Sequence, residues 1–466
     1  MRFQALRGTL EQQGSWYFFS IPGIVVPVCA HCPFPLIARQ RVPVKKSSSK
    51  SLLVVAGAGA AGIMAAGQAA LRKTEVMLLE KMRHPGRKLR ITGKGRCNLS
   101  NVASLPVFIE HFGTTGPFLR QAFHRFFTPD LLDFFQDLGL TVVTERGGRI
   151  FPASGKATDV LRVFEQWLQQ LKVQIRTNVA VDQLHIENGV LTGLTAAGED
   201  IPCGALILAT GAASYPRTGS TGDGYWFAEQ AGHHIVPFRP ALVPLTTTDT
   251  LTARMAGLEV RNTLVRLFVD GKKKAEAFGE LTWIECGLSG PVILTLSGRI
   301  VDALRAGSDV RLLLDLKPAL DEQKLDARLQ RDFETRRLEP INSVLRGILP
   351  QELVSVALEA AAMPADRPAG TIRAQERKKM RLWLKNFPVP ITGHRPLAEA
   401  LITAGGVDTT EVNPRTMESR LVQGLFFAGE VLDIQADTGG YNLQAAFSTG
   451  WLAGCSAANR MIPQQQ

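Results

Sequence analysis

Apolar runs that end in glycine recur along the chain and predict strands buried in a parallel sheet. The first run covers 52–56, and it is followed by glycines at 57, 59 and 62 and by an alanine-rich stretch over 60–72. A second apolar run over 75–80 ends on the acidic Glu80. The order of strand, glycine turn, helix and strand predicts a βαβ unit at this point of the chain.

Up to about residue 240 the pattern predicts further helices and short strands. Ser154 or Thr158 is placed to cap the expected helix over 157–171, and Asn188-Gly189 predicts a tight hairpin turn. The expected helices cover 117–140 and 157–171, and the expected strands cover 173–176, 179–186, 190–195 and 206–208.

From about 241 to 390 the pattern changes to alternating strands, such as 258–270 and 308–316, and then to basic helices through 320–385. The α/β pattern returns after 392, with an apolar strand that meets Gly429 and a closing helix over 442–461. We therefore expect an α/β fold with one nucleotide-binding domain that is split by an insert. Its parts are a flexible basic leader (1–50), the first part of the domain (51–240), a β-barrel-like and helical insert (241–390) and the closing part (391–466).

The three glycines of the first turn have separate mechanical roles. Gly57 makes the tight turn, Gly59 lets the backbone approach a pyrophosphate, and Gly62 lets the helix pack closely on the strand. The helix N-terminus offers unpaired N–H groups to phosphates, and Glu80 lies where a carboxylate binds a ribose hydroxyl. The unit therefore predicts a dinucleotide site.

The hydropathy of the chain argues against a membrane-spanning or exported protein, and its net charge is positive. The chain has 466 residues and a formal net charge of +11, and the 1–50 segment carries +6 of this charge. No apolar run reaches the about 18–20 residues that a membrane-spanning helix needs. Prolines at 22 and 27 interrupt the one stretch that resembles a signal peptide. We expect a cytoplasmic protein that makes no membrane contact.

The cysteines include one close pair and one thiol in a cationic loop. Cys29 and Cys32 lack the second pair that a zinc site needs, so we expect no metal and free thiols in a reducing compartment. Cys97 lies between Arg96 and Asn98, a setting that lowers a thiol pKa. Cys97 is therefore a candidate catalytic proton donor to a substrate carbon, and a buried structural cysteine is the alternative.

Three glycine turns, which follow the strands near 56, 208 and 428, resemble those of FAD-dependent proteins of the glutathione-reductase-like class. Longer motifs sharpen this resemblance, and the chain is similar over about 52–460 to the BaiN/RdsA family of NAD(P)/FAD-dependent oxidoreductases. These motifs cover 85–88, 92–98, 214–216, 218–224, 288–291 and 438–444. One departure concerns a Thr-His pair of the family, because Ile284 and Glu285 stand in its place.

The resemblance implies a Rossmann-type FAD-binding domain and a set of cofactor contacts. With the turn glycines, the expected FAD-binding residues are Gly57, Gly59, Ala61, Gly62, Glu80, Lys81, Arg87, Lys88, Gly93, Val179, Gly211, Gly429, Glu430, Gly440, Tyr441, Asn442 and Leu443. Arg87 and Lys88 would neutralise phosphate oxygens, and the turn that opens the last helix would lie close to the flavin ring.

The resemblance also implies an activity, namely hydride transfer from NAD(P)H through FAD to a carbon–carbon double bond. Members of the family are connected with enone reduction in steroid-type molecules and with reduction of uridine in ribosomal RNA. The substrate is thus a small molecule or RNA. Basic residues of the insert with interleaved Trp383 and Phe387 fit RNA, or else solvated helix faces. A flavin-bound sensor without turnover is the third alternative.

Overall fold

The computed structural model describes residues 9–13, 16–21, 24–28, 52–249 and 251–461. The chain divides into two compact units, 1–47 and 48–466. In the first unit, within the segment expected to be a flexible basic leader, three antiparallel strands form a sheet. The strands are β1 (Thr9–Gln13), β2 (Trp16–Ile21) and β3 (Ile24–Val28). Cys29 and Cys32 lie outside the described residues.

A five-stranded parallel sheet organises the second unit. Its strand order is β23-β13-β4-β5-β9. The bounds are β4 (Leu52–Ala56), β5 (Glu75–Glu80), β9 (Gln174–Thr177), β13 (Ala205–Leu208) and β23 (Leu425–Phe427). The strands β4, β13 and β23 are almost completely buried, as their uninterrupted apolar runs predict.

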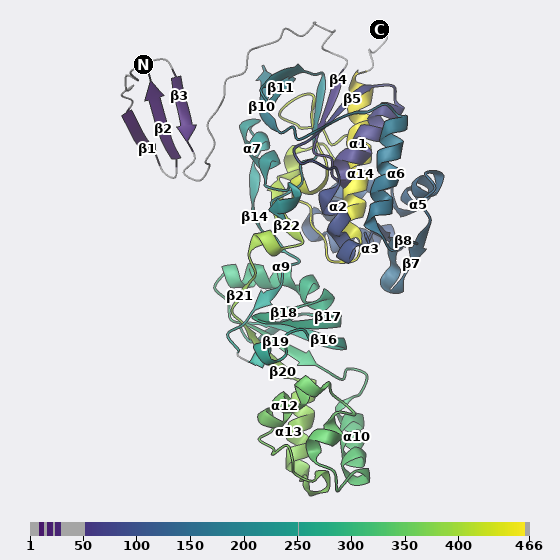
Figure 1. Ribbon diagram of the computed structural model, residues 1–466, viewed down its shortest axis with the longest axis vertical. Helices are drawn as coiled ribbons and strands as arrows, with labels where there is room; N and C mark the ends of the chain where they lie inside the picture. Colours follow the sequence, from purple (N-terminus) through teal and green to yellow (C-terminus); the bar gives the residue numbers. More distant parts are fainter. Residues whose placement is uncertain (1–8, 14–15, 22–23, 29–51, 250, 462–466) are drawn as a thin grey trace, which may run out of the picture. The chain divides into compact units, whose positions relative to one another are not determined.

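Two long helices, α1 (Ala60–Leu71) and α14 (Tyr441–Met461), run side by side against this sheet (Figure 1). Glycines of α14 allow the close approach. A Cβ atom at Gly450 would lie 2.3 Å from the Ala61 carbonyl oxygen, and one at Gly454 would lie 2.3 Å from that of Ala65. The last helix of the chain is therefore part of the nucleotide-binding domain, as the sequence predicts.

The predicted helix over 117–140 is two helices in the structure. These are α4 (Gly116–Arg125) and α5 (Thr128–Asp137), and the residues between them are extended. Pro129 explains the break, because it has no N–H to donate to the carbonyl oxygen of Arg125 and its ring clashes with that group, whereas it suits the first turn of a new helix. The predicted caps of α6 (Ala157–Gln170) are also wrong, since its N-cap is Lys156 and no side chain caps it.

Small sheets and short helices complete this domain. Asn188 and Gly189 form the predicted hairpin turn, both with positive φ. The short strands are β6 (Ser100–Asn101), β7 (Val142–Thr144), β8 (Arg149–Pro152), β10 (Val181–Glu187), β11 (Val190–Ala196), β12 (Glu199–Pro202), β14 (Ile235–Ala241) and β22 (Ile402–Val407). The short helices include α2 (Arg87–Ile91), α3 (Leu105–His111) and α7 (Asp223–Gln230).

The insert contains a seven-stranded antiparallel sheet with order β20-β19-β16-β17-β18-β15-β21. Its strands are β15 (Leu245–Thr246), β16 (Glu259–Val269), β17 (Lys272–Ile284), β18 (Gly287–Ser289), β19 (Val310–Asp315), β20 (Phe387–Ile391) and β21 (Gly393–His394). Its helices are α8 (Leu251–Arg254), α9 (Pro291–Arg305), α10 (Glu322–Thr335), α11 (Ile341–Leu345), α12 (Gln351–Ala360) and α13 (Ala374–Lys385).

The sheet and the helices α10, α12 and α13, which lie together in Figure 1, share one hydrophobic core that is separate from the core of the parallel sheet. The architecture is thus a Rossmann-type α/β domain with an antiparallel insert, as predicted. Across the described part of the chain, no helix has the length and apolar character needed to cross a membrane.

Candidate functional site

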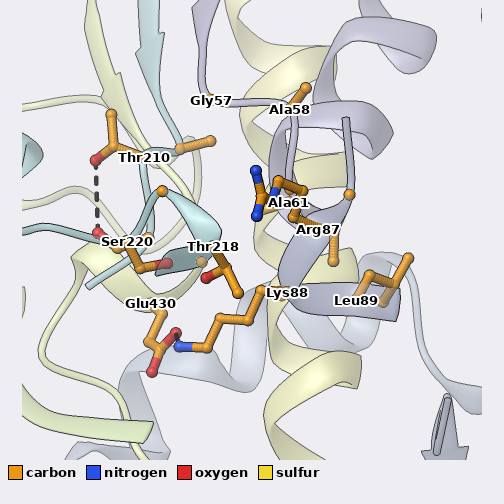
Figure 2. Close-up of a pocket in the computed structure, with 18 of the residues that line it drawn as sticks. Gly57, Ala58, Ala61, Arg87, Lys88, Leu89, Thr210, Thr218, Ser220 and Glu430 are labelled. Carbon is orange, nitrogen blue, oxygen red and sulfur yellow. Dashed lines mark hydrogen bonds and ion pairs between the residues drawn. The ribbon is translucent and has the colours of Figure 1, made fainter. Parts of the chain in front are cut away.

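A cavity lies at the carboxyl ends of β4, β13 and β23, where ligands bind in open α/β sheets. It contains about 1330 Å³ of space free of protein atoms, including space open to solvent. The three glycine turns predicted from the sequence all line it, through Gly57, Gly211 and Gly429. Figure 2 shows the first turn, with Gly57, Ala58 and Ala61, facing Thr210 and Ser220 across the cavity.

The glycines of the first turn differ in what surrounds them. A Cβ atom at Gly57, which has φ +100°, would lie 2.5 Å from the Ala209 carbonyl oxygen, and one at Gly62 would lie 1.8 Å from the Gly57 carbonyl oxygen. A Cβ atom at Gly59 would meet nothing within 4 Å. The protein itself therefore requires glycine at 57 and 62. At Gly59 the open space beside the backbone is available to a ligand, as the fingerprint predicts.

Glu80 lies at the predicted position at the end of β5. Its carboxylate accepts hydrogen bonds from the backbone N–H groups of Ala58 (2.9 Å) and Met82 (2.8 Å), so it also ties the glycine turn to the strand. Burial raises the pKa of Glu80 above its ordinary value, and these two hydrogen bonds oppose the shift. The N–H of Val179 donates to the Glu80 carbonyl oxygen at 3.0 Å, which places Val179 beside it in the lining.

Lys88 and Glu430 were predicted separately, and the structure joins them. Lys88 Nζ lies 2.7 Å from a carboxylate oxygen of Glu430 and 2.7 Å from the hydroxyl of Ser214 (Figure 2). The backbone N–H of Thr403 donates to the other Glu430 oxygen at 3.1 Å. Both charged side chains are about one-fifth exposed. This pair links α2 to the turn after β23 across the cavity.

The other two predicted cations differ in their partners. Lys81 forms an ion pair with Asp223 at 2.6 Å and contacts the Thr221 hydroxyl. Arg87 is exposed on α2, and no carboxylate of the described residues pairs with it. In Figure 2 the Arg87 guanidinium extends into the space between the first glycine turn and Thr218. Arg87, whose charge also acts on Glu80, would thus be available to neutralise a bound phosphate.

Apolar side chains form the lining where α14 begins. Leu443 belongs to the first turn of α14, and Leu401, Ile402 and Ile434 come from neighbouring segments. Asn442 also lines the cavity, but its amide is turned to the chain before the helix. It donates to the Ala436 carbonyl oxygen and accepts from the Ala436 N–H, both at 2.9 Å. Asn442 therefore holds the preceding loop.

Most predicted cofactor residues line the cavity, and four do not. Gly62 packs behind the turn, Gly93 lies next to the Asn98 backbone, and Gly440 packs on the Ser100 backbone. The Tyr441 ring stacks on His111 with ring centroids 3.9 Å apart. The predicted residues that line the cavity are Gly57, Gly59, Ala61, Glu80, Lys81, Arg87, Lys88, Val179, Gly211, Gly429, Glu430, Asn442 and Leu443.

The prediction of an acidic thiol at Cys97 is wrong. Cys97 is fully buried, and this burial raises its pKa to about 12, against the smaller opposing effect of a hydrogen bond with Thr92. Cys97 is also absent from the lining of the cavity. The neighbouring charges were a misleading signal because the Arg96 guanidinium turns to Glu145 and to the Phe151 ring. Cys97 is the buried structural cysteine of the alternative interpretation.

Only some basic residues of the insert helices pair with carboxylates; among the described residues, Arg346, Arg373, Lys378 and Lys379 are exposed and form no ion pair. Arg377 and Arg381 both pair with Asp326, and Arg336 pairs with Glu339. The interleaved aromatic residues are part of the core, since the Trp383 and Phe387 rings lie 4.5 Å apart and Phe387 is buried. These contacts favour the interpretation as helices with paired surface charges.

The sequence signals missed two buried polar residues. The His233 ring is buried between the Glu411 carboxylate (3.0 Å) and the Ser419 hydroxyl (2.7 Å), although its place between a helix and a strand is typical of a surface or capping residue. Asn101 was not singled out at all, although its buried amide binds two loops that meet near the cavity. Its position three residues after the 92–98 motif was the available signal.

The cavity fits the cofactor implied by the family. The cradle at Gly59 is open to a pyrophosphate, the first N–H groups of α1 have no acceptor within the helix, and Arg87 supplies positive charge beside them. Glu80 is placed for a ribose hydroxyl, and the apolar lining near Leu443 suits a flat ring system. Gly59, Ala61, Glu80 and Arg87 would hold the dinucleotide part.

Comparison with known proteins identifies the family of the chain. Residues 51–456 match the family described as HI0933-like protein Rossmann domain. A 3-dehydro-bile acid delta(4,6)-reductase of Clostridium scindens is 33% identical over 408 residues, which cover 87% of this chain and 98% of that protein. A ribosomal RNA dihydrouridine synthase of Haemophilus influenzae is 28% identical over 413 residues, with 87% and 98% coverage.

Among solved structures, an open conformation of a flavocytochrome c3 fumarate reductase aligns with a TM-score of 0.48 and 17% identity. The alignment covers 89% of this chain and 79% of that one. The family match over most of the chain confirms the predicted family and fold class. The chain therefore belongs to the HI0933-like Rossmann family.

Proposed function

We propose that this chain reduces a carbon–carbon double bond of a small, largely apolar unsaturated substrate, with NAD(P)H as the electron donor. One observation carries the proposal. The cavity combines a phosphate-binding glycine turn with an apolar lining from Leu401, Ile402, Ile434 and Leu443. The relative from Clostridium scindens, named as a bile acid reductase, supports a substrate of this class.

FAD, when bound, supplies the transfer of hydride to and from carbon. The chain supplies binding and orientation. The N–H groups that open α1 and the Arg87 guanidinium bind the phosphates, and Glu80 binds the adenosine ribose. The apolar side chains around Leu443 exclude water from the place where a double bond would react.

The donor and the compartment are also part of the proposal. The sequence contains one dinucleotide fingerprint, at 57–62, so we infer that NAD(P)H enters the substrate side of the same cavity for a single transfer and then leaves. A cytoplasmic location is supported by four free cysteines among the described residues, of which Cys97, Cys203 and Cys455 are buried.

Reduction of uridine in ribosomal RNA is the competing substrate assignment, because two relatives carry that name. Binding of a polyanion calls for a continuous surface of unpaired cations. In the insert, Arg336, Arg377 and Arg381 are paired with carboxylates, so only part of its positive charge is available. This partial pairing and the apolar lining of the cavity are the reasons for favouring the small molecule.

The test follows the flavin absorbance under anaerobic conditions. The FAD-loaded protein is mixed first with NADH or NADPH and then, in separate samples, with a conjugated steroid enone or with uridine-containing ribosomal RNA. We expect the nicotinamide to bleach the flavin and the enone to restore its colour. Reoxidation by RNA alone, with binding that weakens steeply as salt rises, would reverse the substrate assignment. A flavin that no nicotinamide bleaches would contradict the proposed donor.

A further inference from the structure

The buried amide of Asn101 joins two loops to the start of α14. Asn101 is 3% exposed, and its Nδ2 donates to the carbonyl oxygens of Gly147 and Gly439, both at 3.0 Å. Its Oδ1 accepts from the Ala103 N–H at 3.0 Å. All three contacts agree with one orientation of the amide, so every polar atom of the side chain has a partner.

The loop that Asn101 holds leads directly into the cavity. Gly439 and Gly440 have φ values of 142° and 103°, and a Cβ atom at Gly440 would lie 2.3 Å from the Ser100 carbonyl oxygen. Tyr441 then begins α14, and the next residues of the helix, Asn442 and Leu443, line the cavity. The segment 100–101 is thus the support on which the N-terminus of α14 is placed.

A second set of hydrogen bonds, which begins at Ser100, holds α14 to its surroundings further along the helix. The Ser100 hydroxyl donates to the Gln444 side-chain oxygen at 2.7 Å and lies 2.8 Å from the Thr128 hydroxyl. The Ser448 hydroxyl donates to the Phe126 carbonyl oxygen at 2.6 Å. The helix is therefore held along its first two turns, and Asn101 holds Gly439, just before the helix begins.

We propose that Asn101 is a positioning residue for the flavin, which it does not touch, because it sets where the N-terminus of α14 points. The inference rests on the proposed function, since it needs FAD in this cavity. The N-terminus of a helix carries partial positive charge, and its effect falls off within the first turn. A small displacement of α14 would therefore alter both the affinity for FAD and the ease with which the bound flavin gains negative charge on reduction.

The test replaces the donor with an acceptor of the same size, in Asn101→Asp. The carboxylate would face the Gly147 and Gly439 carbonyl oxygens, which lose their shared donor. We expect FAD to bind about tenfold more weakly, which corresponds to about 1.4 kcal/mol, and the reduction potential of the bound flavin to become more negative. Asn101→Ser, which keeps one uncharged donor, should shift both quantities less and serves if the aspartate variant does not fold.

Ser419→Ala is the matched control for loss of stability. The Ser419 hydroxyl is buried and accepts from the N–H groups of Leu421 and Val422, but Ser419 does not line the cavity. This control should lower the melting temperature without changing FAD affinity or potential. Asn101 variants that lose stability alone, like the control, would overturn the positioning role. A wild-type protein that takes up no FAD would overturn the proposed function together with this inference.

Discussion

The spacing of residues in a short motif can predict the role of each one, as the first glycine turn shows at Gly57, Gly59 and Gly62. The fingerprint predicted a separate role for each, and the surroundings of each differ accordingly. Gly57 and Gly62 have no room for a side chain because backbone atoms lie within 2.5 Å of the Cβ position, whereas Gly59 has nothing within 4 Å. These roles were predictable because they depend on a short stretch of chain.

Replacement of Gly59 therefore separates ligand binding from folding. We expect Gly59→Val to weaken FAD binding about tenfold to a hundredfold, as an overpacked site costs about 1–3 kcal/mol. The melting temperature of the ligand-free protein should change little. Gly298→Val is the matched control, since its Cβ position on α9 is also open. A Gly59→Val protein that retains FAD at the wild-type affinity would refute the phosphate placement.

For Cys97 we predict that a substitution leaves the reaction rates unchanged. Its thiol is buried and its pKa is raised to about 12, so it holds its proton and has no path to a substrate. Cys97→Ala should leave the rates of flavin reduction and of substrate reduction unchanged, with a stability loss of about 1 kcal/mol. Stopped-flow measurement of the two half-reactions checks this. A selective slowing of substrate reduction would restore the thiol to the mechanism.

The pairing of Lys88 with Glu430 could not be predicted. The two residues are 342 positions apart, and each was recognised only through its own local motif. Asn101 was missed for a related reason, because an isolated asparagine after a loop gives no sign of the two carbonyl groups that it binds. Local patterns identify which residues surround the cavity, but the contacts between those residues depend on the fold.

At the scale of elements, the buried strands and the bounds of the helices near 60–72, 157–171 and 442–461 were predicted well, whereas the break within 117–140 and the packing partners of the helices were not. The strand runs at β4, β13 and β23 were recognisable because all their residues are apolar. The division of 117–140 into α4 and α5 depends on Pro129, which the apolar periodicity alone does not register. The contact between α1 and α14 joins helices from opposite ends of the domain, so it lay beyond any local pattern.

This contact predicts an effect on stability. A side chain at Gly454 would press on the Ala65 backbone, since its Cβ position is 2.3 Å from the carbonyl oxygen. Gly454→Val should destabilise the protein by about 1–3 kcal/mol or more, measured by urea unfolding. Gly298→Val again serves as the control and should unfold near the wild-type midpoint. Equal midpoints for the two variants would mean that α1 and α14 do not pack in this way.

At the scale of the whole molecule, a buried histidine makes stability depend on pH. His233 connects the end of α7 to the Glu411 and Ser419 region, which lies about 180 residues further along the chain. Burial lowers the pKa of His233, although Glu411 opposes the shift. Unfolding exposes the ring and restores an ordinary pKa of about 6.5, so the unfolded chain binds the extra proton first.

The protein should therefore lose stability as the pH falls below about 6.5 towards the lowered pKa of folded His233. Above about 6.5 the ring is neutral in both states, and its contribution is constant. Comparison of urea midpoints at several pH values from 7.5 downwards should show a smaller loss in His233→Gln, which cannot titrate. Parallel losses in wild type and variant would assign the acid sensitivity to other groups.

The central claim is that FAD lies in the cavity with its pyrophosphate on the turn of Gly57, Gly59 and Gly62. The most direct measurement is the flavin content of the purified protein, before and after incubation with excess FAD and removal of unbound cofactor. We predict a yellow protein that reaches one FAD per chain, and a Gly59→Val protein that does not. A folded wild-type protein that stays colourless after incubation would contradict the account.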